Sequence, residues 1–268
     1  MTAPASATTP VHVPRQTLTR VFWRCLFLQA AWNRRGMQNL GFAYAIEPAL
    51  CALYADPAQR EEALRRHLGF FNCHPYMAAA IVGGAIHHEE RVAAGIEPGQ
   101  GPLAYKQALQ GPLAAIGDGF FWTALRPFFG ALAALGALLL GGWAIVAALV
   151  LYNVISFALR IGLFRAGYRE GDRLVQVIGR LSLPAVADRL RTAGAALAGV
   201  AAAVFALRGP AALPAGLAPE GAALAVAAAV LGYVALARGA RLMPTAYLAT
   251  LAAATVAFLA VLLQGAAR

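Results

Sequence analysis

Residues 128–151 form a run of 24 positions without a charged side chain. At about 1.5 Å per residue, a helix of this length crosses the hydrocarbon core of a bilayer. The composition agrees, because 60% of the 268 residues are hydrophobic, 13% are charged and the mean hydropathy is +0.62. A soluble domain of this size is far more polar. The sequence therefore predicts an all-α integral membrane protein.

The chain divides by composition into three regions. Residues 1–14 are rich in Pro, Thr and Ala and predict a disordered tail. Residues 15–127 mix short apolar pieces with polar turns, and residues 128–268 form a transmembrane helical region. Further apolar segments lie at 193–207, 221–237 and 245–263. A basic segment at about 160–191 is expected on the cytoplasmic side by the positive-inside rule; it carries Arg160, Arg165, Arg169, Arg173, Arg180, Arg189 and Arg191.

The first half predicts amphipathic, broken and re-entrant helices. Residues 15–32 alternate apolar and arginine faces at helical spacing, which suits a helix in the membrane interface or one packed on a partner subunit. Asp56 followed by Pro57 is a helix-start signal, and His67 on that helix is expected to be a solvated surface residue. Residues 72–86 are too short to span, and Pro75 with the Gly83–Gly84 pair favours a re-entrant or broken helix.

The net charge of +10 does not indicate a nucleic-acid binder. Of the 22 basic residues, 21 are Arg, and they punctuate apolar stretches instead of clustering on a soluble domain. Binding to anionic lipid headgroups is the better interpretation. The three cysteines, Cys25, Cys51 and Cys73, are not arranged as a zinc site or a disulfide frame, and they are interpreted as buried free thiols.

The stretch GPLAAIGDGFFWTALRP at 111–127 supplies the first candidate site residues. A carboxylate among apolar residues is expensive at membrane depth, so Asp118 either binds a ligand's hydroxyl groups or caps a helix that starts at Gly119. Trp122 stacks on a ligand ring or anchors the chain at the membrane interface. Arg126 pairs with Asp118 or lies at headgroup level. The interpretation is a broken helix or hairpin that lines a polar pathway.

Four more polar residues stand beside breaks in the apolar pattern. Asn72 and His74 flank the start of the short apolar segment at Pro75, and Gln38 and Asn39 lie in the turn GMQNLGF. Their amide and imidazole groups suit a ligand's hydroxyls, or they satisfy loose backbone at a helix break.

The cluster HHEE at 87–90 is a weak metal candidate. Adjacent histidines point about 100° apart on a helix, so an ion pair of Glu89 or Glu90 with Arg91 or with an arginine of a partner subunit is favoured over a metal site. The sequence contains neither a phosphate-binding loop nor a nucleophile motif. It therefore predicts a non-catalytic protein with no cofactor and no metal.

Three stretches, in this order, resemble one family. WNRRGMQNLGFAYAIEPAL, RRHLGFFNCHPYMAAAIVGGAIHHEE and GPLAAIGDGFFWTALRP are similar to the IID component of the mannose/fructose/sorbose family of the bacterial phosphoenolpyruvate:sugar phosphotransferase system. The likeness covers roughly residues 15–175. Some positions depart from the family pattern: Cys73 and His74 stand where Thr-Gln is usual, Gly119 where Pro is usual, and the His87–His88 pair where apolar residues usually precede the two acids.

The resemblance implies a multi-pass subunit of the bacterial inner (plasma) membrane. Such a subunit works with a second membrane subunit, IIC, to bind and translocate a hexose-type sugar. Cytoplasmic IIA and IIB phosphocarrier proteins then phosphorylate the sugar, and IID itself is not phosphorylated. Two alternatives remain open: a regulatory or scaffolding membrane subunit of an incomplete system, and a membrane enzyme built on the HHEE cluster.

Overall fold

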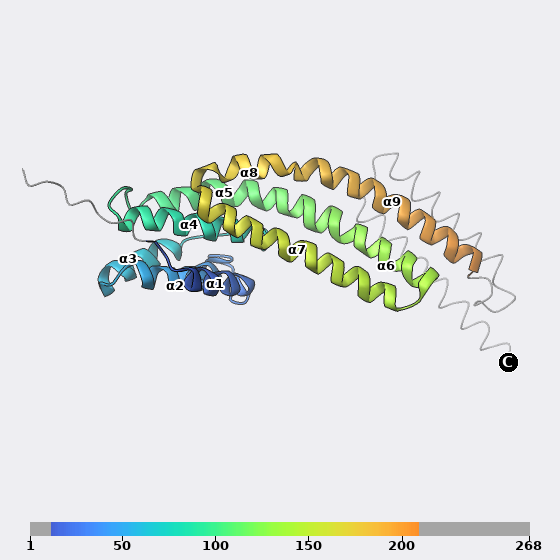
Figure 1. Cartoon of the computed structure of the whole chain (residues 1–268), viewed down its shortest axis with the longest axis horizontal. Helices are drawn as coiled ribbons and strands as arrows, with labels where there is room; N and C mark the ends of the chain where they lie inside the picture. The colour runs from blue at the N-terminus through green and yellow to red at the C-terminus, as the bar shows by residue number, and fades with distance from the viewer. Residues whose placement is uncertain (1–11, 209–268) are drawn as a thin grey trace, which may run out of the picture. The chain divides into compact units, whose positions relative to one another are not determined.

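The computed structural model describes residues 12–208, and this part of the chain is helical (Figure 1). Its nine α-helices are α1 Arg15–Arg24, α2 Asn39–Leu53, α3 Pro57–His67, α4 Ala78–Ala93, α5 Gly101–Gly117, α6 Arg126–Leu140, α7 Trp143–Glu170, α8 Leu174–Leu181 and α9 Leu183–Arg208. Short 3₁₀ turns lie at Cys25–Phe27 and Gly171–Arg173. The predicted all-α fold is confirmed for the described residues. Residues 1–11 of the tail predicted at 1–14 and the predicted spans at 221–237 and 245–263 lie outside them.

The amphipathic helix predicted at 15–32 is shorter than expected. It ends at Arg24 and continues only as the 3₁₀ turn. The Asn33 side chain accepts hydrogen bonds from the backbone N–H groups of Arg35 and Gly36, which holds the chain in a turn instead of a helix. Figure 1 shows α1, α2 and α3 together below α4.

The start of α3 is as predicted, but the environment of its last residue, His67, is not. The Asp56 carboxylate accepts a hydrogen bond from the Ala58 N–H, and Pro57 occupies the first turn. The prediction that His67 is solvated is wrong. His67 is fully buried, because its ring faces Glu89 of α4 and stacks on Phe42 of α2. The prediction that all three cysteines are buried is wrong for Cys51, which is exposed, whereas Cys25 and Cys73 are buried.

No break occurs at Gly83–Gly84, contrary to the prediction, because α4 is continuous through both glycines. The glycines instead allow close packing. A Cβ at Gly83 would collide with the Phe164 carbonyl oxygen of α7, and one at Gly84 would collide with the Tyr105 ring of α5. The same holds for the facing helix, because a Cβ at Gly167 of α7 would collide with the Ala80 carbonyl oxygen of α4. Small residues that let backbones approach are typical of helix pairs in membranes.

The stretch GPLAAIGDGFFWTALRP is also continuous, so the predicted broken helix or hairpin is wrong there. A π-helical segment at Asp118–Leu125 joins α5 to α6 without a gap. Pro127 cannot donate a backbone hydrogen bond, and wider turns accommodate such a defect without ending the helix. Asp118 has helical backbone angles and makes no cap, so the prediction that it caps a helix at Gly119 is wrong.

The uncharged run at 128–151 is a helical hairpin and not one span. Helix α6 ends at Leu140, and Gly141 adopts a φ of 89° that favours glycine. Helix α7 then runs 28 residues to Glu170, so Arg160, Arg165 and Arg169 lie on this helix. No charged residue marks this turn in the sequence, because the chain is apolar on both sides of it.

Two continuous helical stretches of the described part are long and apolar enough to cross a membrane. They are Gly101–Leu140 and Trp143–Phe205, and only 17% of the most apolar window of each is buried within the chain. Large apolar side chains such as Leu140, Trp143 and Leu149 are exposed along them. This exposure fits lipid contact, since a soluble core helix would be mostly buried.

Candidate functional site

The short segment between α3 and α4 is held in place by Gln38. The Gln38 side-chain amide donates to the Cys73 carbonyl oxygen and accepts from the Cys73 N–H, both at 2.9 Å. The Gln38 backbone N–H donates to the Phe71 carbonyl oxygen at 2.8 Å. Gln38 is 2% exposed, so both polar atoms of its side chain are used inside the protein. Its position accounts for a structural role in fixing residues 71–73.

Asn39 and Asn72 do not share a site with each other. Asn39 accepts from the Asn33 side chain and donates to the Leu68 carbonyl oxygen, which ties two turns together. Asn72 is exposed, and its backbone N–H donates to the Gln110 side chain of α5. A cavity lies beside His74, and neither asparagine lines it.

Three of the predicted site residues meet at this cavity, which has a volume of about 340 Å³. His74 comes from the segment before α4, Trp122 from the π-helical segment and Arg126 from the start of α6. Residues that sequence reasoning missed complete the wall: Leu26, Leu28, Gln29, Pro75, Tyr76 and Arg160. The volume is within the range of pockets that hold small organic molecules.

His74 is a buried, neutral member of this wall. Its ring stacks on Phe121 with the centroids 4.9 Å apart, and Trp122 packs edge-on against it. Burial lowers the pKa of His74 to about 4, with the positive charge of Arg160 as a second cause. The Nδ1 atom accepts a hydrogen bond from the Tyr76 N–H at 3.3 Å, so the neutral ring carries its hydrogen on Nε2.

Arg160 is the functional candidate that the sequence did not reveal as such. It is 7% exposed on α7 and donates from Nη2 to the Pro75 carbonyl oxygen at 2.9 Å. Its guanidinium lies 4.5 Å from the centroid of the Tyr76 ring, a cation–π distance. In the sequence it counted only as one arginine of the basic segment. One sequence feature distinguishes Arg160 from the other arginines: it is the first charged residue after the uncharged stretch that begins at residue 128.

Asp118 is not among the residues that line the cavity. It is half-buried, and its carboxylate makes no ion pair with any residue that the structure describes, Arg126 included. Burial raises the pKa of the Cys73 thiol to about 12, and the negative charge of Asp118 adds to this effect. The Cys73 thiol is therefore protonated at neutral pH.

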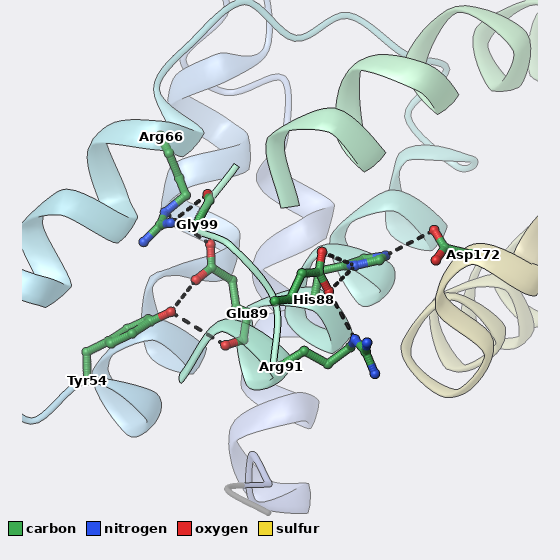
Figure 2. Close-up of polar contacts among 8 residues, drawn as sticks. Tyr54, Arg66, His88, Glu89, Arg91, Gly99 and Asp172 are labelled. Carbon is green, nitrogen blue, oxygen red and sulfur yellow. Dashed lines mark hydrogen bonds and ion pairs between the residues drawn. The ribbon is translucent and has the colours of Figure 1, made fainter. Parts of the chain in front are cut away.

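The HHEE cluster is a structural junction, and Figure 2 shows two of its members, His88 and Glu89, with their partners. Glu89 is fully buried and accepts from the Tyr54 hydroxyl at 2.6 Å, with His67 Nε2 at 2.9 Å and Arg66 Nε at 3.4 Å. Burial, with the Glu89 carboxylate adding to it, raises the pKa of Tyr54. Glu89 thus joins α4 to the end of α2 and to α3.

The neighbours of Glu89 serve other segments. His88 lies between Glu97 and Asp172, at 2.9 and 3.5 Å, and Glu90 accepts from the Val13 N–H and the Tyr168 hydroxyl. The favoured pairing of Arg91 with Glu89 or Glu90 is wrong, because Arg91 pairs with Glu97 at 3.0 Å. Within residues 12–208, no group of three metal-ligating side chains is placed to hold an ion.

Comparison with known proteins places these features in a family. A family model described as the PTS system mannose/fructose/sorbose family IID component matches residues 12–206. The chain is 37% identical over 177 residues to the PTS system mannose-specific EIID component of Escherichia coli (strain K12), which covers 64% of this chain and 62% of that protein. It is 35% identical over 170 residues to the fructose permease IID component of Bacillus subtilis (strain 168), which covers 62% and 60%.

Solved structures agree with this assignment. The cryo-EM structure of the mannose transporter ManYZ in complex with microcin E492 (MceA) contains a chain that is 34% identical, with a TM-score of 0.55 over 70% of each chain. A structure described as a membrane protein matches at 35% identity, with a TM-score of 0.60 over 70% of this chain and 69% of that one. The match spans less than two thirds of the length of the curated relatives. The chain belongs to the IID components of the mannose/fructose/sorbose family of the phosphotransferase system.

Proposed function

We propose that this chain is the IID membrane subunit of a sugar phosphotransferase permease in the bacterial inner membrane. In this role it binds and translocates a hexose-type sugar together with a IIC subunit. Phosphoryl transfer is carried by cytoplasmic IIA and IIB proteins, so this chain is non-catalytic. The observation that carries the proposal is the family match over residues 12–206, which includes both long apolar helices and the cavity.

The partner assignment is supported by a relative. ManYZ is a mannose transporter, and one chain of its structure aligns over 70% of this one. We therefore propose a hetero-oligomer with a IIC partner. The exposed apolar side chains of α6 and α7 offer surface for both lipid and such a partner.

Within this function, the cavity is our candidate for the sugar contact. Trp122 is 47% exposed and offers an aromatic face for a sugar ring, while Gln29 and His74 offer hydrogen-bonding groups. The exposed Arg126 also lines it. Asp118 remains a proposed pathway residue outside the cavity. If Asp118→Asn and Asp118→Ala both left uptake and assembly unchanged, this part of the proposal would fail.

The three amide residues have an indirect part in the proposal. Gln38, Asn39 and Asn72 act on the sugar only through the segments they position, because none of them lines the cavity.

The experiment is phosphoenolpyruvate-dependent sugar uptake in cells that lack their own mannose-type permease. This chain is expressed with its neighbouring IIC and IIAB proteins, and then each protein is omitted in turn, across hexoses and amino sugars. Uptake that requires this chain supports the translocator role and identifies the sugar. A stable complex with IIC that supports no uptake would contradict it and favour the regulatory or scaffolding alternative.

A further inference from the structure

The cavity carries positive charge that no acidic side chain within residues 12–208 balances through an ion pair. Arg126 and Arg160 both line it, and no aspartate or glutamate is among its lining residues. Neither arginine takes part in an ion pair with any described residue. Arg160 lies on an apolar helix and is 7% exposed, so bulk water does little to stabilise its charge. A buried cation without a counter-ion is costly, and binding of an anion removes part of that cost.

The same wall holds hydrogen-bond donors that find no acceptor. Arg160 uses Nη2 for the Pro75 carbonyl, but its Nε has no partner among the described residues. The Nε2 atom of His74 likewise has none, and it carries the ring hydrogen because Nδ1 accepts from Tyr76. Buried donors without acceptors are rare in folded proteins. A ligand rich in acceptor oxygens would satisfy them after a small movement of these side chains.

The size and the apolar part of the cavity define the rest of the ligand. About 340 Å³ is more than a bare phosphate ion needs and fits a small organic molecule. Leu26, Leu28 and Trp122 supply apolar and aromatic surface on which the organic part can lie. Guanidinium groups bind both carboxylate and phosphate oxygens in a two-pronged geometry, and two arginines on one wall suit the greater charge and the three free oxygens of a phosphate ester.

We propose that this cavity binds a phosphate ester of about hexose size, with the phosphate at Arg126 and Arg160 and the organic part against Trp122. Two sources share this chemistry: a soluble sugar phosphate and the glycerophosphate headgroup of an anionic phospholipid. The inference goes beyond uptake of a neutral sugar and is tested on purified protein, so its failure leaves the proposed function standing and the reverse also holds.

The first test measures binding of radiolabelled glucose 6-phosphate to the full chain purified with its IIC partner in detergent. Glycerol 3-phosphate, inorganic phosphate and glucose serve as competitors. The two esters are expected to compete at least about tenfold better than glucose, because glucose cannot engage the two guanidinium groups. Arg160→Gln and Arg126→Gln should each weaken binding by about tenfold or more, and Arg160→Lys by less, since it keeps the charge.

The controls separate the site from general damage. Arg165→Gln removes an exposed arginine from the same helix, five positions further on, and should bind like the parent. Arg126 is exposed, so Arg126→Gln keeps the test valid if Arg160→Gln does not fold. Co-purification with IIC reports on assembly for each variant.

The second test addresses the lipid source. The complex is placed in nanodiscs of phosphatidylcholine with and without phosphatidylglycerol, and bound lipid is measured by native mass spectrometry after release. Retention of phosphatidylglycerol that Arg160→Gln and Arg126→Gln abolish, without binding of soluble esters, assigns the site to a lipid headgroup. If neither source binds, or if both bind equally to the arginine variants and to Arg165→Gln, the proposal is wrong.

Discussion

The guanidinium of Arg160, on the long helix α7, donates a hydrogen bond of 2.9 Å to the carbonyl oxygen of Pro75, which lies 85 positions earlier in the chain. This contact joins an apolar helix to the short segment that carries His74. Tyr76, in the same segment, stacks against the guanidinium. The shape of the cavity therefore depends on how α7 packs against the first half of the chain.

The buried amide of Gln38 is expected to stabilise the segment that carries His74. Gln38→Leu removes two hydrogen bonds and leaves the N–H and carbonyl of Cys73 without partners. Each unsatisfied buried group costs about 1–3 kcal/mol, so the two together predict a loss of about 2–6 kcal/mol in unfolding free energy. Thermal unfolding of the purified complex measures this loss. Asn72→Ala, at an exposed position, is the control, and an equal effect of the two variants would contradict the structural role of Gln38.

The crossing of α4 and α7 should tolerate no added methyl group. In Gly83→Ala and Gly167→Ala the new Cβ collides with a backbone carbonyl oxygen of the facing helix, which cannot rotate away. Each variant is expected to lose about 1–3 kcal/mol of unfolding free energy, as overpacked cores do. Gly162→Ala, also on α7, has open space at its Cβ and should be neutral or stabilised by up to about 1 kcal/mol. The melting temperatures of the three variants test this prediction. Equal shifts for all three would contradict the close packing of α4 on α7.

Stability should fall in mild acid because of His74. Its pKa is about 4 in the folded protein, below the ordinary value of 6.5, so the unfolded chain binds a proton more readily. The contribution of neutral His74 is therefore complete above pH 6.5 and is lost as the pH falls towards 4. His74→Phe should unfold with a shallower dependence on pH over this window. His67, whose pKa burial also lowers, keeps part of the dependence in the variant. Identical pH profiles for parent and variant would exclude this role of His74.

Local signals in the sequence predicted local structure well. Asp56 and Pro57 start α3 as expected, because a cap and a first-turn proline act within one turn of helix. Trp122 and Arg126 belong to one sequence motif and His74 to another, and the structure brings all three to one cavity. Their roles in binding a sugar remain predictions.

Features that depend on distant partners were not predictable in this way. His67 is buried because Glu89, 22 positions later, faces it, and no pattern within α3 indicates that pairing. Arg160 lines the cavity because α7 reaches the Pro75 segment. The glycines at 83 and 84 were interpreted as helix breakers, although their effect is to admit Phe164 and Tyr105 of other helices. The hairpin at Gly141 has apolar residues on both sides, so neither hydropathy nor charge marks it.

Sugar uptake by two tryptophan variants tests directly whether the cavity contacts the sugar. Trp122→Ala removes the aromatic wall of the cavity, whereas Trp143→Ala removes an 83% exposed tryptophan at the start of α7. Both are expressed with the IIC and IIAB partners in cells without a mannose-type permease, and co-purification with IIC verifies assembly. Trp122→Ala is expected to lower kcat/KM for uptake by about tenfold, as loss of a ring contact does, and Trp143→Ala is expected to retain uptake. Normal uptake by an assembled Trp122→Ala complex would show that the cavity does not contact the sugar.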